Sequence, residues 1–128
     1  MGTEPSLTFT GRLRSVTYAL RGIRIMIVSQ HNAWIHLAAT LAVVAAGVML
    51  RLSWAEWCWI VLAIVSVWTA EALNTAFEFL TDVASPGFHP VAGKAKDVAA
   101  GSVLLAAAGA VVIGLLIFGP KLIALLPQ

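Results

Sequence analysis

Residues 71 to 82 place five polar side chains at helical spacing inside a segment that is otherwise apolar. They are Glu71, Asn74, Thr75, Glu78 and Asp82. At 100° per residue, all five fall within one arc of roughly 100°. An acid at the centre of a bilayer costs about 2.5–3.5 kcal/mol. Since membrane folding does not require that cost, the spacing predicts a functional site on one face of a membrane helix.

Basic residues that follow this helix suggest what the site could bind. Lys94 and Lys96 come shortly after the carboxylates, beyond a turn at residues 85–90. Magnesium takes one or two carboxylates, several waters and phosphate oxygens, and lysines neutralise a transferring phosphate. The pattern therefore suits magnesium-bound ATP, with Glu78 near the metal. The deeper Glu71 would meet an acceptor from the lipid and accept its hydroxyl proton.

Known nucleotide and metal motifs are absent from the sequence. Gly93-Lys94 lacks the upstream glycine and the following Ser or Thr of a Walker A loop. No Glu-x-x-His pair of the di-iron type is present. A nucleotide site in this chain must be built in another way.

Composition predicts the element that carries these residues. The chain has 128 residues, of which 60% are hydrophobic and 11% charged, and its mean hydropathy is +0.92. Soluble domains are typically about 45–50% apolar, so the sequence predicts an all-α integral membrane protein. A net charge of +2, scattered along the chain, gives no indication of nucleic acid binding. The single cysteine excludes an intramolecular disulfide.

Hydrophobic runs predict three membrane spans, at about 33–50, 54–82 and 98–118. A helix over about 7–29 precedes them, with an apolar stripe on one face and Arg14, Tyr18 and Arg21 on the other. This pattern is typical of an amphipathic helix in the membrane interface, although an ordinary bundle helix remains an alternative. Without an internal repeat or linker, residues 1–128 are expected to form one domain. The stripe consists of Phe9, Leu13, Val16, Leu20, Ile23 and Ile27.

Basic residues also predict the orientation in the bacterial cytoplasmic (inner) membrane. Six of the eight lysines and arginines lie before the first span or between the second and third, against two on the other side. This bias predicts a cytoplasmic N-terminus and an outside C-terminus. Glu71 to Asp82 then approach the cytoplasmic surface.

The motif resembles a known family. The segment Glu71-Ala-Leu-Asn-Thr-Ala-Phe-Glu78, with Asp82, Phe88-His89-Pro90 and Ala95-Lys96-Asp97, is similar to the prokaryotic diacylglycerol kinases, which include undecaprenol kinases. The resemblance covers the chain from Phe9 through the third span. It implies a homotrimer with active sites shared between neighbours, and transfer of the ATP γ-phosphate to a lipid hydroxyl with Mg²⁺ as cofactor.

The resemblance also implies roles for individual residues. Glu71 would be the catalytic base and Asn74 its polar neighbour. Glu78 would bind the metal and ATP, with Gln30 as a weak further ligand and Asp82 as another candidate. Arg12, Glu71 and Ala100 would contact the lipid. The nucleotide would be bound by Tyr18, Gln30, Glu78, Gly87, Phe88, His89, Lys96 and Asp97.

Two positions depart from the family pattern. Gln30 stands where the family usually has a glutamate that helps to hold magnesium, so a neutral amide replaces a charge. Gly11 stands where an arginine is found in the diacylglycerol kinases, and the adjacent Arg12 could substitute for it.

Several alternatives remain open from the sequence. Diacylglycerol is the first expected acceptor and undecaprenol the alternative, towards which the loop before Pro90 leans. A small proton-coupled transporter subunit would use Glu71 and Glu78 as a proton path, and a non-catalytic assembly subunit would tolerate Glu71→Gln. Asp97 could be the N-cap of the third span. His31 and His36 are expected to be interface and packing residues rather than ligands.

Overall fold

The chain folds into four helices in a computed structural model that describes residues 9–126. They are α1 (Phe9–Ser29), α2 (His31–Met49), α3 (Trp54–Ala84) and α4 (Pro90–Ile123). No strand occurs in residues 9–126, which confirms the all-α prediction. The helices α2, α3 and α4 are each long and apolar enough to cross a membrane, as the three predicted spans require. Residues 7 and 8 of the expected surface helix lie outside the described residues.

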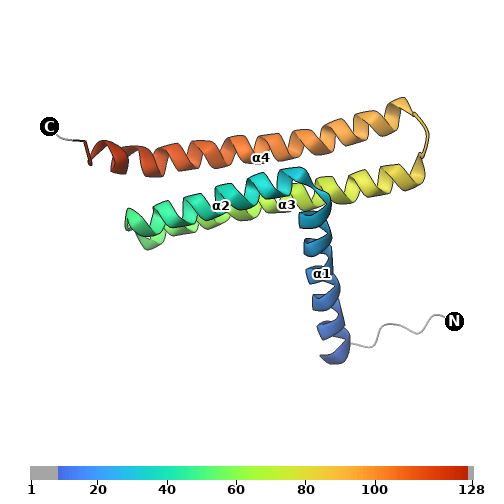
Figure 1. Cartoon of the computed structure of the whole chain (residues 1–128), viewed down its shortest axis with the longest axis horizontal. Helices are drawn as coiled ribbons and strands as arrows, with labels where there is room; N and C mark the ends of the chain where they lie inside the picture. Colours follow the sequence, from blue (N-terminus) through green and yellow to red (C-terminus); the bar gives the residue numbers. More distant parts are fainter. Residues whose placement is uncertain (1–8, 127–128) are drawn as a thin grey trace.

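The three apolar helices run side by side, and α1 leaves them crosswise near the start of α2 (Figure 1). The most extensive pairing joins α3 and α4. Both of these helices continue past the start of α2 to their connecting loop (Figure 1). The part of α3 that carries the carboxylates therefore lies level with α1 and beyond it.

One face of α3 forms the centre of the bundle. Its buried apolar residues Ile60, Ala63 and Val67 recur at intervals of three and four, and Glu71 and Asn74 continue the same series. Since residues at this spacing share one helix face, the polar site is an extension of the packing face of α3. Fold and site therefore use the same helical register.

Side chains from the loops define two of the helix ends. Ser53 forms a capping box with Glu56, whose Oε2 accepts a 2.7 Å hydrogen bond from the Ser53 N–H. At the start of α4, Nδ1 of His89 accepts a hydrogen bond from the Val91 N–H, and Pro90 occupies the first turn. The helix thus begins eight residues before the predicted span, and Asp97 is not an N-cap.

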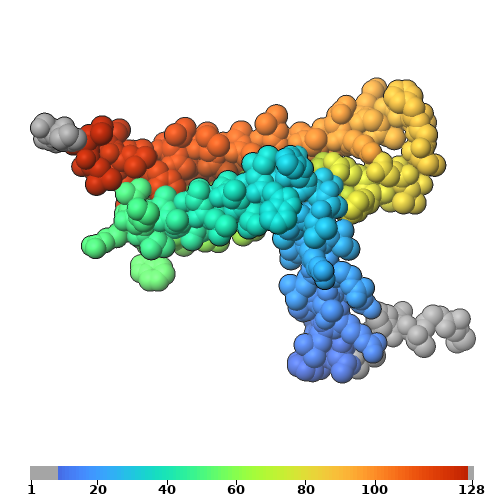
Figure 2. All heavy atoms as spheres, in the orientation of Figure 1, coloured from blue at the N-terminus to red at the C-terminus, as the bar shows by residue number. Residues whose placement is uncertain are grey.

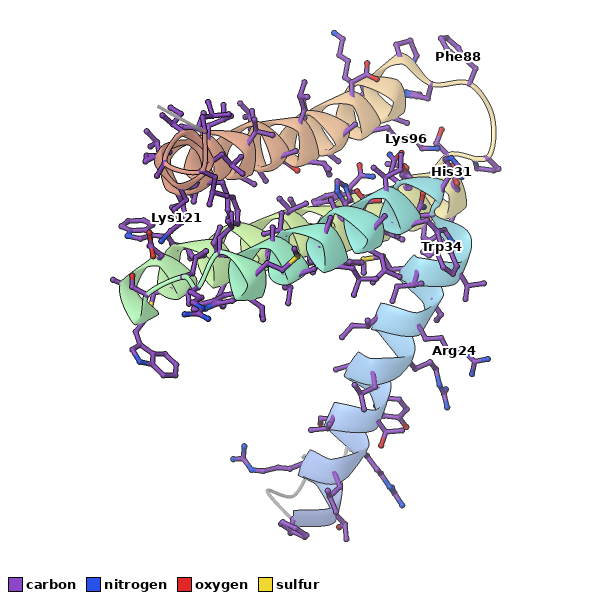
Figure 3. All side chains as sticks on the ribbon, turned by 60° about the vertical axis from the view of Figure 1, so that its left-hand side comes forward. Arg24, His31, Trp34, Phe88, Lys96 and Lys121 are labelled. Carbon is purple, nitrogen blue, oxygen red and sulfur yellow. The ribbon has the colours of Figure 1, made fainter. Side chains whose placement is uncertain are left out.

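Two contacts stabilise the end of the bundle where α3 begins and α4 ends. Lys121 Nζ at the end of α4 lies 3.2 Å from Glu56 Oε1 at the start of α3, and Figure 3 shows Lys121 reaching in that direction. The Trp57 ring packs directly over Gly47 of α2. These contacts hold all three apolar helices together at the end of the bundle far from Glu71 and Glu78.

The helix α1 is largely exposed. It projects from the body of the molecule (Figure 2), and Met26 near its C-terminal end is its one buried residue among those described. Phe9, Leu13 and Leu20 of the predicted apolar stripe are exposed. Arg24 points away from the bundle (Figure 3). The crosswise direction of α1 agrees with a helix that lies along a membrane surface, but its position in the interface remains a prediction.

Candidate active site

Polar side chains of α3 become more exposed toward its C-terminal end. Glu71, Asn74 and Thr75 are buried, Glu78 is half-buried and Asp82 is exposed. The Thr75 hydroxyl donates a 2.8 Å hydrogen bond to the Glu71 carbonyl oxygen, so its polar group is satisfied within the helix. Within the bundle, Glu71 is therefore more deeply buried than Glu78, and the predicted difference in their depth in the membrane stays a prediction.

Glu78 is held by amide groups on both of its carboxylate oxygens. Gln30 Nε2 donates to Oε2 at 2.8 Å, and Asn74 Nδ2 donates to Oε1 at 3.0 Å. Gln30 occupies the break between α1 and α2, and its backbone N–H still bonds to Met26. Charge-assisted hydrogen bonds of this kind are the stronger class in proteins. Three residues predicted for catalysis and metal binding thus meet where three helices join.

Glu71 lies deeper and faces a different neighbour. Its side chain has no exposed surface, and neither carboxylate oxygen has a hydrogen-bond partner among the described residues. His36 Nε2 on α2 lies 3.6 Å from Glu71 Oε2. His36 was expected to be an interface or packing residue, and its approach to Glu71 was not predicted because no local pattern links positions on two different helices.

A second group of predicted residues surrounds the loop between α3 and α4. Asp82, Gly87, Phe88, His89 and Lys96 line one cavity of about 240 Å³. Lys96 Nζ pairs with Asp82 Oδ1 across the two helices, and Figure 3 shows Lys96 pointing from α4 toward α3. Phe88 is 96% exposed and points away from the helices (Figure 3). The loop therefore presents backbone groups and an aromatic ring, and α4 presents a lysine, beside one cavity.

Four predicted residues lie outside both groups. Arg12, Tyr18, Asp97 and Ala100 are exposed. The Arg21 guanidinium lies 5.8 Å from the centre of the Tyr18 ring, in a cation–π arrangement. Within one chain, α1 therefore contributes neither Arg12 nor Tyr18 to the loop cavity or to the buried carboxylates.

The oxygen donors around Glu78 suit magnesium, whereas a site made of protein ligands alone is not present. No group of three or more His, Cys, Asp or Glu side chains is placed to hold a metal within residues 9–126. Magnesium bound with a nucleotide needs only one or two carboxylates, since phosphates and waters supply the rest. Glu78 and the side-chain carbonyl oxygen of Gln30 are hard oxygen donors of the right kind. So is Asn74 Oδ1, which is buried without a hydrogen-bond partner among the described residues. The residues present therefore fit a nucleotide-bound ion.

Comparison with known proteins places the chain in a family. A family model described as prokaryotic diacylglycerol kinase matches residues 17–118. The chain belongs to this family. The chain is similar to an undecaprenol kinase of Bacillus subtilis (strain 168), with 42% identity over 109 residues, covering 85% of this chain and 89% of that protein. A diacylglycerol kinase of Synechocystis sp. is 36% identical over 115 residues, covering 89% of this chain and 66% of that protein.

No solved structure shows significant similarity to the chain. The family match includes every residue from Glu71 to Asp97, whereas Arg12 precedes it. Membership of the diacylglycerol kinase family identifies the chain as a lipid kinase. The family and the three apolar helices together indicate a multi-pass membrane protein. The transporter and assembly-subunit alternatives have no support from the comparison.

Proposed function

We propose that the chain transfers the γ-phosphate of ATP to the hydroxyl group of a membrane lipid alcohol. The observation that carries this proposal is the pairing of two carboxylates on one face of α3, at different depths and with different partners. Glu71 is fully buried and neither of its oxygens is hydrogen-bonded within residues 9–126, whereas Glu78 is half-buried and held by two amides. Seven residues of helix separate them by about 10 Å, which leaves room for a phosphoryl group between acceptor and metal.

Each group has a distinct role in this mechanism. Glu71 accepts the proton of the lipid hydroxyl as that oxygen attacks the γ-phosphorus in line with the leaving ADP. Asn74 lies between the two acids and orients Glu78. Glu78 and Gln30 would hold magnesium, which neutralises charge on the phosphates when bound. Lys96 and the loop at Gly87 to His89 would contact the nucleotide.

The acceptor needs a path from the lipid to Glu71. A groove of about 370 Å³ lies between α1 and α3, lined by apolar residues such as Ile23, Met26 and Phe79, and by Thr75. Thr75 follows Glu71 by one helical turn on the same face. We propose that the lipid enters through this groove, with α1 lying in the membrane interface as its outer wall.

A homotrimer with shared sites would complete the set of binding residues. Arg12, Tyr18, Asp97 and Ala100 are exposed and lie outside both polar groups of a single chain. The apolar residues of α4 are also exposed, including Leu104, Leu105 and Val111. A neighbouring copy could bring such residues to the site. Separately, the distribution of lysines and arginines favours an orientation in which the N-terminus and the α3–α4 loop both face the cytoplasm.

Two acceptors are proposed for the reaction. Diacylglycerol is the first candidate because of the family resemblance, although the loop before Pro90 leans toward undecaprenol. The 42% identity to a protein named undecaprenol kinase, over most of both chains, favours undecaprenol as a second candidate. An apolar groove selects by shape and length and not by hydrogen bonds, so a direct comparison of the two lipids is required.

The test is ATP-dependent phosphorylation by the purified chain in mixed micelles. Diacylglycerol and undecaprenol are offered in parallel while magnesium is titrated. Glu71→Gln removes the proposed base without changing its size, and Glu56→Gln makes the same change on the same helix at the capped end far from the site. We expect Glu71→Gln to abolish transfer and Glu56→Gln to retain it.

The same experiment identifies the preferred acceptor. The lipid phosphorylated with the higher kcat/KM is assigned as the substrate. Full activity of Glu71→Gln would refute the proposed base, and failure to phosphorylate both lipids at every magnesium concentration would refute the proposed function.

A further inference from the structure

The buried Glu71 carboxylate has one polar side chain close to it on another helix. Among the described residues neither of its oxygens is hydrogen-bonded, and His36 Nε2 approaches Oε2 to 3.6 Å. The Glu71 side chain has no exposed surface, and the His36 side chain is 16% exposed. A carboxylate removed from water requires a hydrogen-bond donor or an opposite charge to remain ionised. His36 is positioned to be that donor.

The His36 ring is itself held by neighbouring side chains. Trp68 on α3 meets it edge to face, with ring centroids 6.4 Å apart and an interplanar angle of 66°. Trp68 Nε1 in turn donates a 3.1 Å hydrogen bond to Thr40 Oγ1 on α2. Thr40 follows His36 by one helical turn, so α2 and α3 hold the imidazole from two sides.

The surroundings of His36 limit its choice of partner. His36 and Thr40 border a cavity of about 250 Å³ between α2, α3 and α4 that is otherwise lined by apolar residues such as Ile60, Val67 and Phe118. An apolar cavity offers a water molecule too few partners to be retained. The imidazole therefore finds its polar partner in the protein, on the side of Glu71.

We propose that His36 is a positioning residue for the catalytic base. Its Nε2–H donates to Glu71 Oε2 and thereby leaves Oε1 as the oxygen that accepts the proton of the lipid hydroxyl. The separation of 3.6 Å is longer than a formed hydrogen bond of about 2.7–3.2 Å. Hydrogen bonds at catalytic sites commonly shorten when substrate binds. This inference rests on the proposed function, because it assigns a partner to the same base.

Two substitutions at position 36 separate donation from bulk. His36→Leu keeps an apolar side chain of similar reach but removes the donor. His36→Gln places an amide nitrogen near the position of Nε2 and restores a donor. His31→Leu makes the first change at an exposed position on the same helix and serves as the control.

Steady-state kinetics in mixed micelles distinguishes positioning from folding. A misplaced base lowers the rate of the chemical step, and errors of about 1 Å can cost roughly 100-fold. We expect His36→Leu to lower kcat roughly 10- to 100-fold with little change in the KM for ATP. His36→Gln should recover most of that loss, and His31→Leu should match the unsubstituted chain. Unchanged kcat in His36→Leu, or no recovery in a folded His36→Gln, would overturn the proposal.

A second measurement tests the contact without relying on turnover. The ¹⁵N resonances of the three histidines are compared between the unsubstituted chain and Glu71→Gln in micelles. We expect the Nε2 resonance of His36 to move while those of His31 and His89 stay in place. If neither lipid is phosphorylated by the unsubstituted chain, the proposed function fails, and this shift still decides the contact. An unmoved His36 resonance would show that His36 does not hold Glu71.

Discussion

Gln30→Glu is the substitution that most directly tests the metal assignment. The Gln30 amide donates a 2.8 Å hydrogen bond to Glu78 Oε2, so the change removes a donor and places a second carboxylate beside the first. A hydrogen bond to a charged group contributes about 1.5–3 kcal/mol. Two unit charges that relax to about 4 Å repel by about 4 kcal/mol at an effective dielectric constant of about 20. Since water screens part of this repulsion at the half-buried Glu78, we expect the magnesium-free chain to lose about 2 to 4 kcal/mol of stability.

Magnesium should reverse this effect. A divalent ion between the two carboxylates replaces their repulsion by attraction, so Gln30→Glu should regain stability as magnesium is added. Each 1.4 kcal/mol gained from the second carboxylate lowers the half-saturating magnesium concentration about tenfold. The assay is thermal unfolding in detergent micelles, followed by the fluorescence of the five tryptophans, with magnesium titrated in parallel with turnover.

The matched control is Gln30→Met, which removes the amide donor without adding charge. It should lower the stability by less than Gln30→Glu does and should show no recovery with magnesium. If Gln30→Glu is as stable as the unsubstituted chain and insensitive to magnesium in both assays, then Glu78 and position 30 do not share a metal, and the proposed metal assignment is wrong.

Three further predictions follow from other parts of the structure. A Cβ at Gly47 would lie 2.8 Å from the Trp57 ring, so Gly47→Ala should destabilise the chain by about 1–3 kcal/mol through overpacking; an unchanged unfolding temperature would contradict that contact. Arg51 has a φ of 51°, a region where a non-glycine residue costs about 1–2 kcal/mol, so Arg51→Gly should raise the unfolding temperature, whereas Arg51→Ala should not. Lys96→Met should raise the KM for ATP roughly 10- to 100-fold through loss of a charged contact. Lys94→Met should change it less, and equal effects in steady-state assays would argue against a specific role for Lys96.

Local sequence pattern was sufficient for the first three helices and for the polar face of α3. The series from Ile60 to Asn74 repeats every three or four residues, and such a repeat defines a helix face whatever packs against it. The first residue of α4 was not predicted correctly from the sequence. The apolar run begins near residue 98, but the helix begins at Pro90 because His89 caps it and charged residues are tolerated in its exposed first turns. Hydrophobicity locates a membrane span and does not locate the end of a helix that extends beyond it.

The sequence by itself determined which residue types could perform chemistry and which of them share one side of α3. Only the tertiary structure decided their partners: Gln30 with Glu78, His36 with Glu71, and Lys96 with Asp82. Periodicity within a helix follows from its 3.6 residues per turn. Contacts between helices depend instead on how α1, α2 and α4 are placed against α3, and that placement results from packing along the whole bundle. This is why the motif could be found in twelve residues of sequence, whereas His36, which lies on another helix, was visible only in the fold.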